Sequence, residues 1–271
     1  LTVFGGTLII FALSRMSGDP RVLYMDDYSK PDPEVWARLG EKFHLNDPVP
    51  VQYGYWVWDV MRGEFGDSIA MQRPVEQVIF SRMWNSAQLG IFAWILGTLI
   101  GIPLGVLSAI KRGTIIDYLA RGFALFGQSL PSFWVAIMAI LIFSGMLGWL
   151  PSAGRGDGEL KYFVLPILVL GWLPAAGYLR LTRSSMLEVL DSEYIKFARA
   201  KGVNTTQILW KHAFRNALLA PLTFSALLLL GFVTGATVAE TVFAWPGLGR
   251  LAVSSVFGND FPVLSAIMLL M

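Results

Sequence analysis

Residues 193–216 read EYIKFARAKGVNTTQILWKHAFRN, a polar stretch set between two strongly apolar segments. Five of its side chains are lysine or arginine, and a single glycine, Gly202, interrupts the run. Charged side chains are costly to bury in hydrocarbon, whereas the flanking segments are apolar enough to enter it. The stretch therefore predicts a water-facing connection at a membrane surface, joining two segments that cross the membrane.

Within this connection the residues predict two short helices separated by a glycine. Asp191 or Ser192 can cap the first helix, and Gly202 suits the left-handed residue that ends it. Asn204 can cap the second helix, with Gln207 at capping-box spacing. Helical spacing groups Tyr194, Phe197, Ala198 and Lys201 on the first helix, and Trp210 with Phe214 on the second. A helical loop that is merely rich in positive charge is the simpler alternative.

The composition of the whole chain also indicates a membrane protein. Of its 271 residues, 55% are hydrophobic and 15% are charged, whereas soluble domains carry about 25% charged residues. A helix needs roughly 20 apolar residues to cross the hydrocarbon. The complete candidates are 86–110, 118–147, 162–180 and 217–239, and the partial ones are 1–14 and 261–271. We therefore expect an all-α membrane protein of one domain, 1–271, with six transmembrane helices, the first and last truncated in this chain.

The distribution of lysine and arginine predicts how these helices are oriented. The connections assigned to the outside hold 11 basic and 15 acidic residues, and those assigned to the inside hold 10 basic and 4 acidic residues. The outside connections are 15–85, 148–161 and 240–260, and the inside connections are 110–121 and 180–216. Because basic residues favour the cytoplasmic side, we expect a cytoplasmic amino terminus and an extracytoplasmic loop over 15–85. The aromatic run at 53–58 fits either an outer cap or an interfacial belt.

The central parts of the four complete candidate spans lack charged side chains. No Asp, Glu, Lys, Arg or His lies within 86–110, 122–147, 162–179 or 217–239. Such groups usually mark ion or proton relays, so a secondary transporter or channel lacks its usual machinery. The sequence has no cysteine, no G-x-x-x-x-G-K-[ST] phosphate loop and no His-Glu-x-x-His zinc motif, which disfavours a membrane enzyme. Energy for uphill transport would have to come from another polypeptide.

Several landmarks together resemble a known family. Tyr194, the run ARAKG at 198–202, Lys211-His212 and RNAL at 215–218 are similar to the cytoplasmic "EAA" loop of ABC importer permeases of the peptide/nickel group. Further matches are Gly18-Asp19-Pro20, GEFGDS at 63–68, Pro74-Val75, ETVFAWPGLG at 240–249 and Asp260-Phe261-Pro262. The positions that give the loop its name hold Lys196, Phe197 and Ala198, so only the last alanine is kept.

The resemblance implies the transmembrane permease subunit of a binding-protein-dependent importer for di- or oligopeptides. Nickel chelates, glutathione, opines and oligosaccharides are the alternative substrates. The implied partners are a second homologous permease in a heterodimer, two cytoplasmic ATPases, an extracytoplasmic substrate-binding protein and the lipid bilayer, with no nucleic acid. The implied location is a bacterial or archaeal inner membrane. The resemblance implies neither enzymatic activity nor a metal or cofactor for this chain, because ATP and Mg²⁺ bind to the ATPases.

The resemblance also assigns roles to particular residues. It makes 181–216 a coupling loop whose ATPase-docking residues are Lys196, Phe197, Ala198, Arg199, Gly202, Asn204 and Gln207. It places Trp245, Pro246 and Gly247 on the side of the binding protein, where their order also suits a plain surface turn.

Polar residues near the helix breaker Pro131 suggest a substrate path. Backbone groups freed by a proline are tolerated in a membrane where protein or a water-filled cavity takes them up. We therefore take as pathway candidates Gln128, Ser129, Ser132, Thr234 and Thr237. Ordinary hydrogen bonds between helices are the alternative explanation for these residues.

Overall fold

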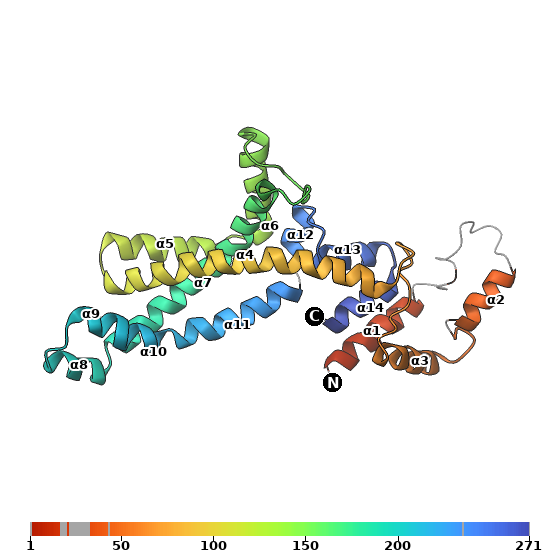
Figure 1. The fold of residues 1–271 in the computed structure, drawn as a ribbon, viewed down its shortest axis with the longest axis horizontal. Coiled ribbons are helices and arrows are strands. Elements are labelled where there is room, and N and C mark those ends of the chain that lie inside the picture. Colours follow the sequence, from red (N-terminus) through yellow and green to blue (C-terminus); the bar gives the residue numbers. More distant parts are fainter. Residues whose placement is uncertain (1, 17–20, 22–32, 43, 235, 271) are drawn as a thin grey trace. The chain divides into compact units, whose positions relative to one another are not determined.

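The described part of the chain is almost entirely helical. The computed structural model describes residues 2–16, 21, 33–42, 44–234 and 236–270 (Figure 1). Within these ranges the only β pairing is an isolated antiparallel bridge between Asp67 and Pro74. The expected all-α class is confirmed. The Gly18-Asp19-Pro20 landmark lies outside the described residues.

The chain divides into two compact units, which we call the first unit (1–82 with 251–271) and the second unit (83–250). The single domain expected over 1–271 stays a prediction beside this division. The first unit contains α1 (Thr2–Met16), α2 (Pro33–Lys42), α3 (Val49–Met61), α14 (Phe261–Leu270), the start of α4 (Val75–Ile110) and most of α13 (Leu248–Phe257). Within it, α1 packs against both α3 and α14.

The aromatic run at 53–58 gives α3 two different faces. Phe11 of α1 is buried, and its ring centroid lies 5.5 Å from that of Tyr53 and 6.1 Å from that of Trp56. These positions recur at helical spacing and so share one side of α3. The exposed aromatic residues are Tyr55 and Trp58. One aromatic face of α3 therefore covers α1, while the other is open.

The loop before α4 is tied to the start of α14 by Asp260. The carboxylate of Asp260 is buried and accepts hydrogen bonds from the Ser68 hydroxyl, from Ile69 N at 3.2 Å and from Ala70 N at 3.3 Å. The Ser68 hydroxyl oxygen in turn accepts from Met71 N at 3.0 Å. Two of the sequence landmarks, GEFGDS and Asp260-Phe261-Pro262, thus form one joint.

The second unit is a helical bundle that begins within α4. Its other elements are α5 (Ile115–Ser129), α6 (Ser132–Ala139), the π-helix η2 (Ile140–Met146), α7 (Leu160–Leu190), α8 (Glu193–Ala200), α9 (Thr205–Gln207), the π-helix η3 (Ile208–Phe214), α10 (Arg215–Ala217), α11 (Leu219–Thr234) and α12 (Thr237–Val242). α7 is its central helix, because α5, α6, α10, α11, α12 and η3 all contact it.

A glycine row lets α4 approach α7 at backbone distance. Gly97, Gly101 and Gly105 recur every four residues and so lie on one face of α4. A Cβ atom on Gly105 would lie 2.7 Å from the Cβ of Thr182, and one on Gly101 would overlap the carbonyl oxygen of Ala175. Small residues at such crossings allow close van der Waals packing where the hydrophobic effect between helices is absent.

The structure changes the expected set of spans. Two helices, α4 and α7, are long and apolar enough to cross a membrane alone, and up to four spans result if each of two bent pairs is one span. Over the described ranges, α1 and α14 are 15 and 10 residues long. The count of six is therefore not confirmed, although the apolar helices and the family shown below support a multi-pass membrane protein.

Two predicted spans are interrupted. The span expected over 118–147 is not one continuous helix: α5 and α6 meet at Pro131 with a bend of 101°, which makes the pair either a broken span or a re-entrant loop. The span expected over 217–239 is also interrupted: α11 starts after a bend of 43° and ends at Thr234, and α12 begins at Thr237. Proline at position 131 lacks the N–H that a continuous helix would use. The sequence located the first break but not its angle.

Candidate functional site

The segment from α8 to α10, residues 193–217, which we call the knob, has the predicted helix–glycine–helix form. Gly202 has φ +77°, its N–H donates to Arg199 O at 2.9 Å, and Val203 N–H donates to Ala198 O at 3.2 Å. This pair of bonds is the Schellman arrangement, in which the left-handed residue favours glycine. The glycine stop predicted for α8 is confirmed.

The start of the second helix follows the sequence in part. The Asn204 side chain accepts a hydrogen bond from Thr206 N at 3.0 Å, which confirms it as the N-cap. In the described structure Gln207 makes no return bond to Asn204, so a full capping box is absent. Ser192 is the N-cap residue of α8, but its hydroxyl donates back to Val189 O.

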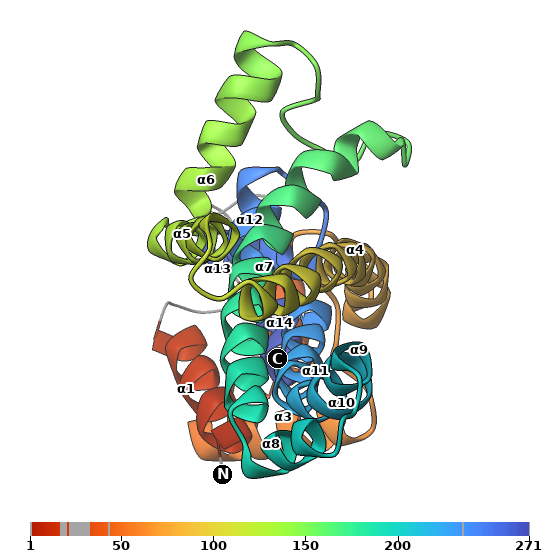
Figure 2. The same ribbon diagram turned by 90° about the vertical axis from the view of Figure 1, so that its left-hand side faces the viewer.

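The knob is seated on the bundle by a small apolar core. Ile195 and Ile208 are buried, and Ala213 and Ala217 pack with Val106, Ala109 and Met186 at the ends of α4 and α7. Asn216 Nδ2 donates to the Tyr194 hydroxyl at 3.0 Å, joining α8 to α10. Both views place the knob at the same end of α7 as the turn between α4 and α5 (Figures 1 and 2). A force on the knob would therefore reach α4 and α7 directly.

The outer face of the knob combines exposed aromatic and basic side chains. Phe197 is 62% exposed and Trp210 is 55% exposed, while Tyr194 is exposed to a lesser extent. The Lys201 ammonium lies 4.5 Å from the centroid of the Phe197 ring. Among the predicted docking residues, Ala198 is half-buried, and the exposed ones are Lys196, Phe197, Arg199, Gly202, Asn204 and Gln207. Exposed apolar groups of this kind commonly mark interaction surfaces.

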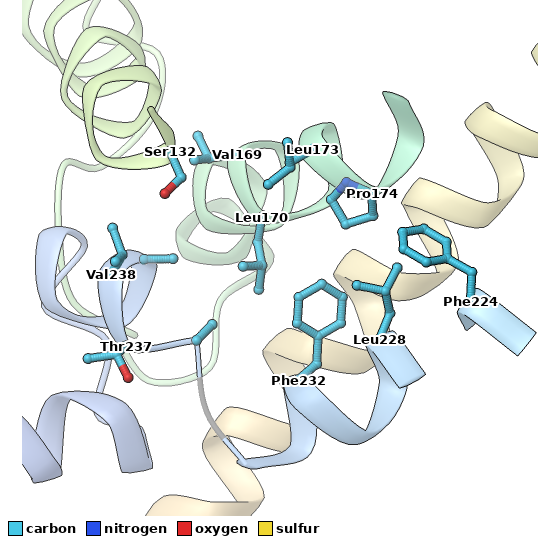
Figure 3. Close-up of a pocket in the computed structure, with 12 residues that line it drawn as sticks. Ser132, Val169, Leu170, Leu173, Pro174, Phe224, Leu228, Phe232, Thr237 and Val238 are labelled. Atoms are coloured by element: carbon cyan, nitrogen blue, oxygen red, sulfur yellow. The ribbon is translucent and has the colours of Figure 1, made fainter. Parts of the chain in front are cut away.

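A pocket of about 470 Å³ opens beside the break between α5 and α6 (Figure 3). Ser132 and Thr237 contribute its hydroxyl groups, and the remaining lining is apolar: Val169, Leu170, Leu173, Pro174, Phe224, Leu228, Phe232, Ala236, Val238 and Ala239. The structure thus brings two of the pathway candidates to one cavity, from segments far apart in the sequence.

The other pathway candidates do not line this pocket. Gln128 is absent from its wall, and the Ser129 hydroxyl is bonded to Leu125 O at 2.8 Å within α5. Thr234 is the last residue of α11, and its side chain lies outside the described part of the structure. A hydrogen bond within α5 therefore accounts for the Ser129 hydroxyl, rather than the bond between helices that was the alternative explanation.

The loop after α12 is buried rather than open. Trp245 is fully buried, packs with Leu89 and Phe163, and donates from Nε1 to Asn85 O at 3.0 Å. Asn85 Nδ2 donates in turn to Pro246 O at 2.9 Å. Only Pro246 of the predicted trio keeps partial exposure, because Gly247 is also buried. Within this chain the Trp245 side chain therefore serves packing and cannot contact a docking protein directly.

Glu240 explains why position 247 is a glycine. The Glu240 carboxylate is fully buried and accepts from the Ser86 hydroxyl at 2.6 Å, from Arg250 N at 3.1 Å and from Ala236 N at 3.3 Å. A Cβ on Gly247 would overlap this carboxylate. The predicted turn gave Gly247 a conformational role. In the structure, glycine is needed because any side chain at this position would overlap the Glu240 carboxylate.

Sequence reasoning missed the buried carboxylates. Glu240 and Asp260 were noted only as letters within motifs, and Asp117, the one acidic residue in the basic connection 110–121, entered only the count of acidic residues. That isolation was a usable signal, since a lone acid among bases often has a cationic partner. Within the described ranges, no group of three or more His, Cys, Asp or Glu side chains is placed to hold a metal ion.

Comparison with known proteins identifies the class. Two solved structures share the fold, both titled inward-facing conformations of the MetNI methionine ABC transporter. One matches with a TM-score of 0.55 and 23% identity over 73% of this chain and 93% of that chain. The other matches with a TM-score of 0.57 and 21% identity, covering 72% and 88%. The chain therefore shares its fold with a chain of these ABC transporter structures.

The sequence comparisons then give the family. Residues 101–271 match the family described as binding-protein-dependent transport system inner membrane component. The oligopeptide transport system permease protein AppB of Bacillus subtilis is 38% identical over 97% of this chain and 86% of its own length. The oligopeptide permease OppB of Salmonella typhimurium is 36% identical, covering 97% and 85%. The chain belongs to this family of membrane transport components, as its motifs indicated.

Proposed function

We propose that the chain is the transmembrane permease subunit of an ATP-driven importer of di- and oligopeptides. It would form half of the substrate path, and a second, homologous permease would supply the other half. Peptide is chosen because AppB and OppB, which match along nearly the whole chain, are named oligopeptide permeases. The chain itself would be non-catalytic, with ATP and Mg²⁺ bound by two separate ATPase subunits.

The observation that carries this proposal is the exposed face of a firmly seated knob. Tyr194, Phe197 and Trp210 project from a segment whose inner side is buried against α4 and α7. An aromatic patch surrounded by lysines and arginines suits a groove on another protein, because aromatic and arginine side chains supply most of the energy at interface centres. We assign the ATPase to this face and propose that the knob is cytoplasmic; the distribution of lysine and arginine supports the same side for the amino terminus.

The opposite end of the second unit would face the binding protein. Pro246 and the neighbouring connection 148–161 are the accessible parts there, whereas Trp245 supports them from beneath. The pocket at Ser132 and Thr237 would form part of the path between the two ends. Its largely apolar lining fits peptide side chains better than a bare metal ion, which prefers oxygen, nitrogen or sulfur ligands.

The test is an uptake experiment on the assembled importer. The chain is co-produced with a homologous permease, ATPases and a binding protein from the same organism, and uptake of labelled di- and oligopeptides into proteoliposomes is measured with ATP inside. Phe197→Glu is expected to release the ATPase during purification and to abolish uptake while the chain remains in the membrane.

The matched control is Phe257→Glu, which changes an exposed phenylalanine of the first unit that is 84% exposed. It is expected to retain the ATPase and uptake. Retention of the ATPase by Phe197→Glu would overturn the docking assignment. Uptake of another solute class with no uptake of any peptide would overturn the choice of substrate.

A further inference from the structure

Asp117 is a buried carboxylate at the end of the second unit that carries the knob. It is 1% exposed, and its Oδ1 atom accepts from Ser108 Oγ at 2.6 Å and from Arg183 Nε at 2.8 Å. Its Oδ2 atom accepts from Gly113 N at 3.0 Å and from Arg183 Nη2 at 3.0 Å. The paired bonds to Arg183 form a bidentate contact, which is stronger and more directional than a single charged hydrogen bond.

These bonds join three helices that meet around one side chain. Ser108 lies near the end of α4, Gly113 is in the turn that follows, Asp117 is in the first turn of α5, and Arg183 is on α7. Arg121 adds a longer contact of 3.7 Å to the same carboxylate. Breaking one partner of a buried ion pair leaves an uncompensated charge, so the joint resists separation of α5 from α7.

The contact between Asp117 and Arg183 lies between two other features of the second unit, the knob and the pocket. Met186, three residues beyond Arg183 on α7, belongs to the core that seats the knob. In the other direction, α5 runs from Asp117 to the break at Pro131, directly before Ser132 in the pocket wall. A displacement of the knob reaches α7 through packing and reaches α5 at its first turn through Asp117.

We infer that Asp117 and Arg183 are a positioning pair that makes α5 move with α7 and the knob, so that movement of the ATPase reaches the pocket at Ser132. The inference rests on the proposed function, because it needs an ATPase that moves the knob. Neither residue lines the pocket at Ser132 and Thr237. A nearby exposed pair, Arg112 and Asp191 at 3.4 Å, joins the turn after α4 to the end of α7, but it is open to water and salt, which makes such pairs weak.

The first experiment measures peptide taken up per ATP hydrolysed, in proteoliposomes holding the complete importer. Asp117→Asn combined with Arg183→Gln removes both charges, so no buried charge is left unpaired. This double variant is expected to keep its bound ATPase and its ATP hydrolysis but to transport about tenfold less peptide per ATP, the scale of couplings carried by such networks. The control Arg112→Gln is expected to stay within about twofold of the original ratio.

The second experiment measures the motion itself and separates positioning from mere stability. The chain has no cysteine, so spin labels can be placed on cysteines introduced at Leu119 of α5 and Glu188 of α7, both exposed and both outside the predicted docking residues. The distance between them is expected to stay fixed through the ATP cycle in the otherwise unchanged importer and to vary in the double variant. A separate variant, Arg183→Lys with Asp117 unchanged, is expected to keep part of the coupling that the double variant loses. Lysine retains the positive charge but cannot make the bidentate contact.

Three results would overturn the inference. The first is a spin-label distance that already varies through the ATP cycle in the unchanged importer. The second is a normal ratio of peptide taken up to ATP hydrolysed in the double variant. The third is a loss of transport by the double variant that is fully explained by a smaller amount of assembled importer. The label distance in the unchanged importer decides the matter even if the double variant fails to assemble. Failure of the proposed function looks different: the unchanged importer itself would bind no ATPase or take up no peptide.

Discussion

Ser68 donates its hydroxyl hydrogen bond to the buried carboxylate of Asp260, 192 residues further along the chain. The same carboxylate accepts two backbone N–H groups of the loop that begins at Ser68. The loop before α4 and the first turn of α14 are therefore one structure, although each looks like an independent motif in the sequence. The joint leads to the first prediction.

Asp260→Ala is expected to destabilise the first unit by about 1–3 kcal/mol, because it leaves buried donors of the 68–70 loop without an acceptor. Thermal unfolding of the detergent-solubilised protein measures the effect. Glu64→Gln, an exposed change in the same loop, is expected to leave the unfolding temperature unchanged. Equal melting of the two variants would show that the joint contributes little.

Gly247→Ala is expected to destabilise the second unit by about 1–3 kcal/mol, since the added methyl overlaps the Glu240 carboxylate and must displace it from Ser86. Gly122→Ala is the matched control, because a Cβ there meets open space on α5. The control is expected to be neutral or slightly stabilising. Thermal unfolding distinguishes them, and a harmless Gly247→Ala would contradict the described packing.

Gly202 separates backbone strain from docking. Its φ of +77° makes any L side chain costly there, by about 1–2 kcal/mol, yet a Cβ meets no atom of this chain within 4 Å. Gly202→Ala and Gly202→Trp are therefore expected to lower stability by similar amounts, while only the tryptophan prevents ATPase binding. Co-purification and uptake measure the difference. Normal uptake by Gly202→Trp would argue against docking at this point.

Cysteines introduced at Ser132 and Thr237 are expected to react with a water-soluble thiol reagent in the assembled importer and to be protected by peptide substrate. Both side chains line the pocket, and the chain has no other cysteine to interfere. A cysteine at Gln128, which is outside the pocket wall, is expected to show no substrate protection. Unreactive thiols at both pocket positions would remove this cavity from the path.

The features that followed from sequence are the ones set by near neighbours. Gly202 ends α8 and Asn204 caps the next helix because glycine tolerates left-handed backbone and an asparagine side chain reaches an N–H two residues on. Pro131 marked the break between α5 and α6 for an equally local reason. The angle of that break, by contrast, depends on what each half packs against.

The partners of buried charges could not be read from the sequence. Asp117 and Arg183 are 66 residues apart, and neither carries a local signal that names the other. Glu240 likewise bonds to Ser86 at a separation of 154 residues. Because this pairing is not visible in the sequence, the motif placed Trp245 at a docking surface, whereas its side chain is buried. Such pairings are decided by how helices assemble, and short-range patterns contain no record of it.

The glycine row on α4 limits where a transporter of this design can bend. Because Gly97, Gly101 and Gly105 put the two backbones in direct contact, turning α4 by one residue would drive Thr98, Ile102 or Val106 into the carbonyl groups of α7. The close contact of the two backbones therefore opposes rotation of α4 against α7. Any alternation between open sides must be accommodated elsewhere, as at the break between α5 and α6.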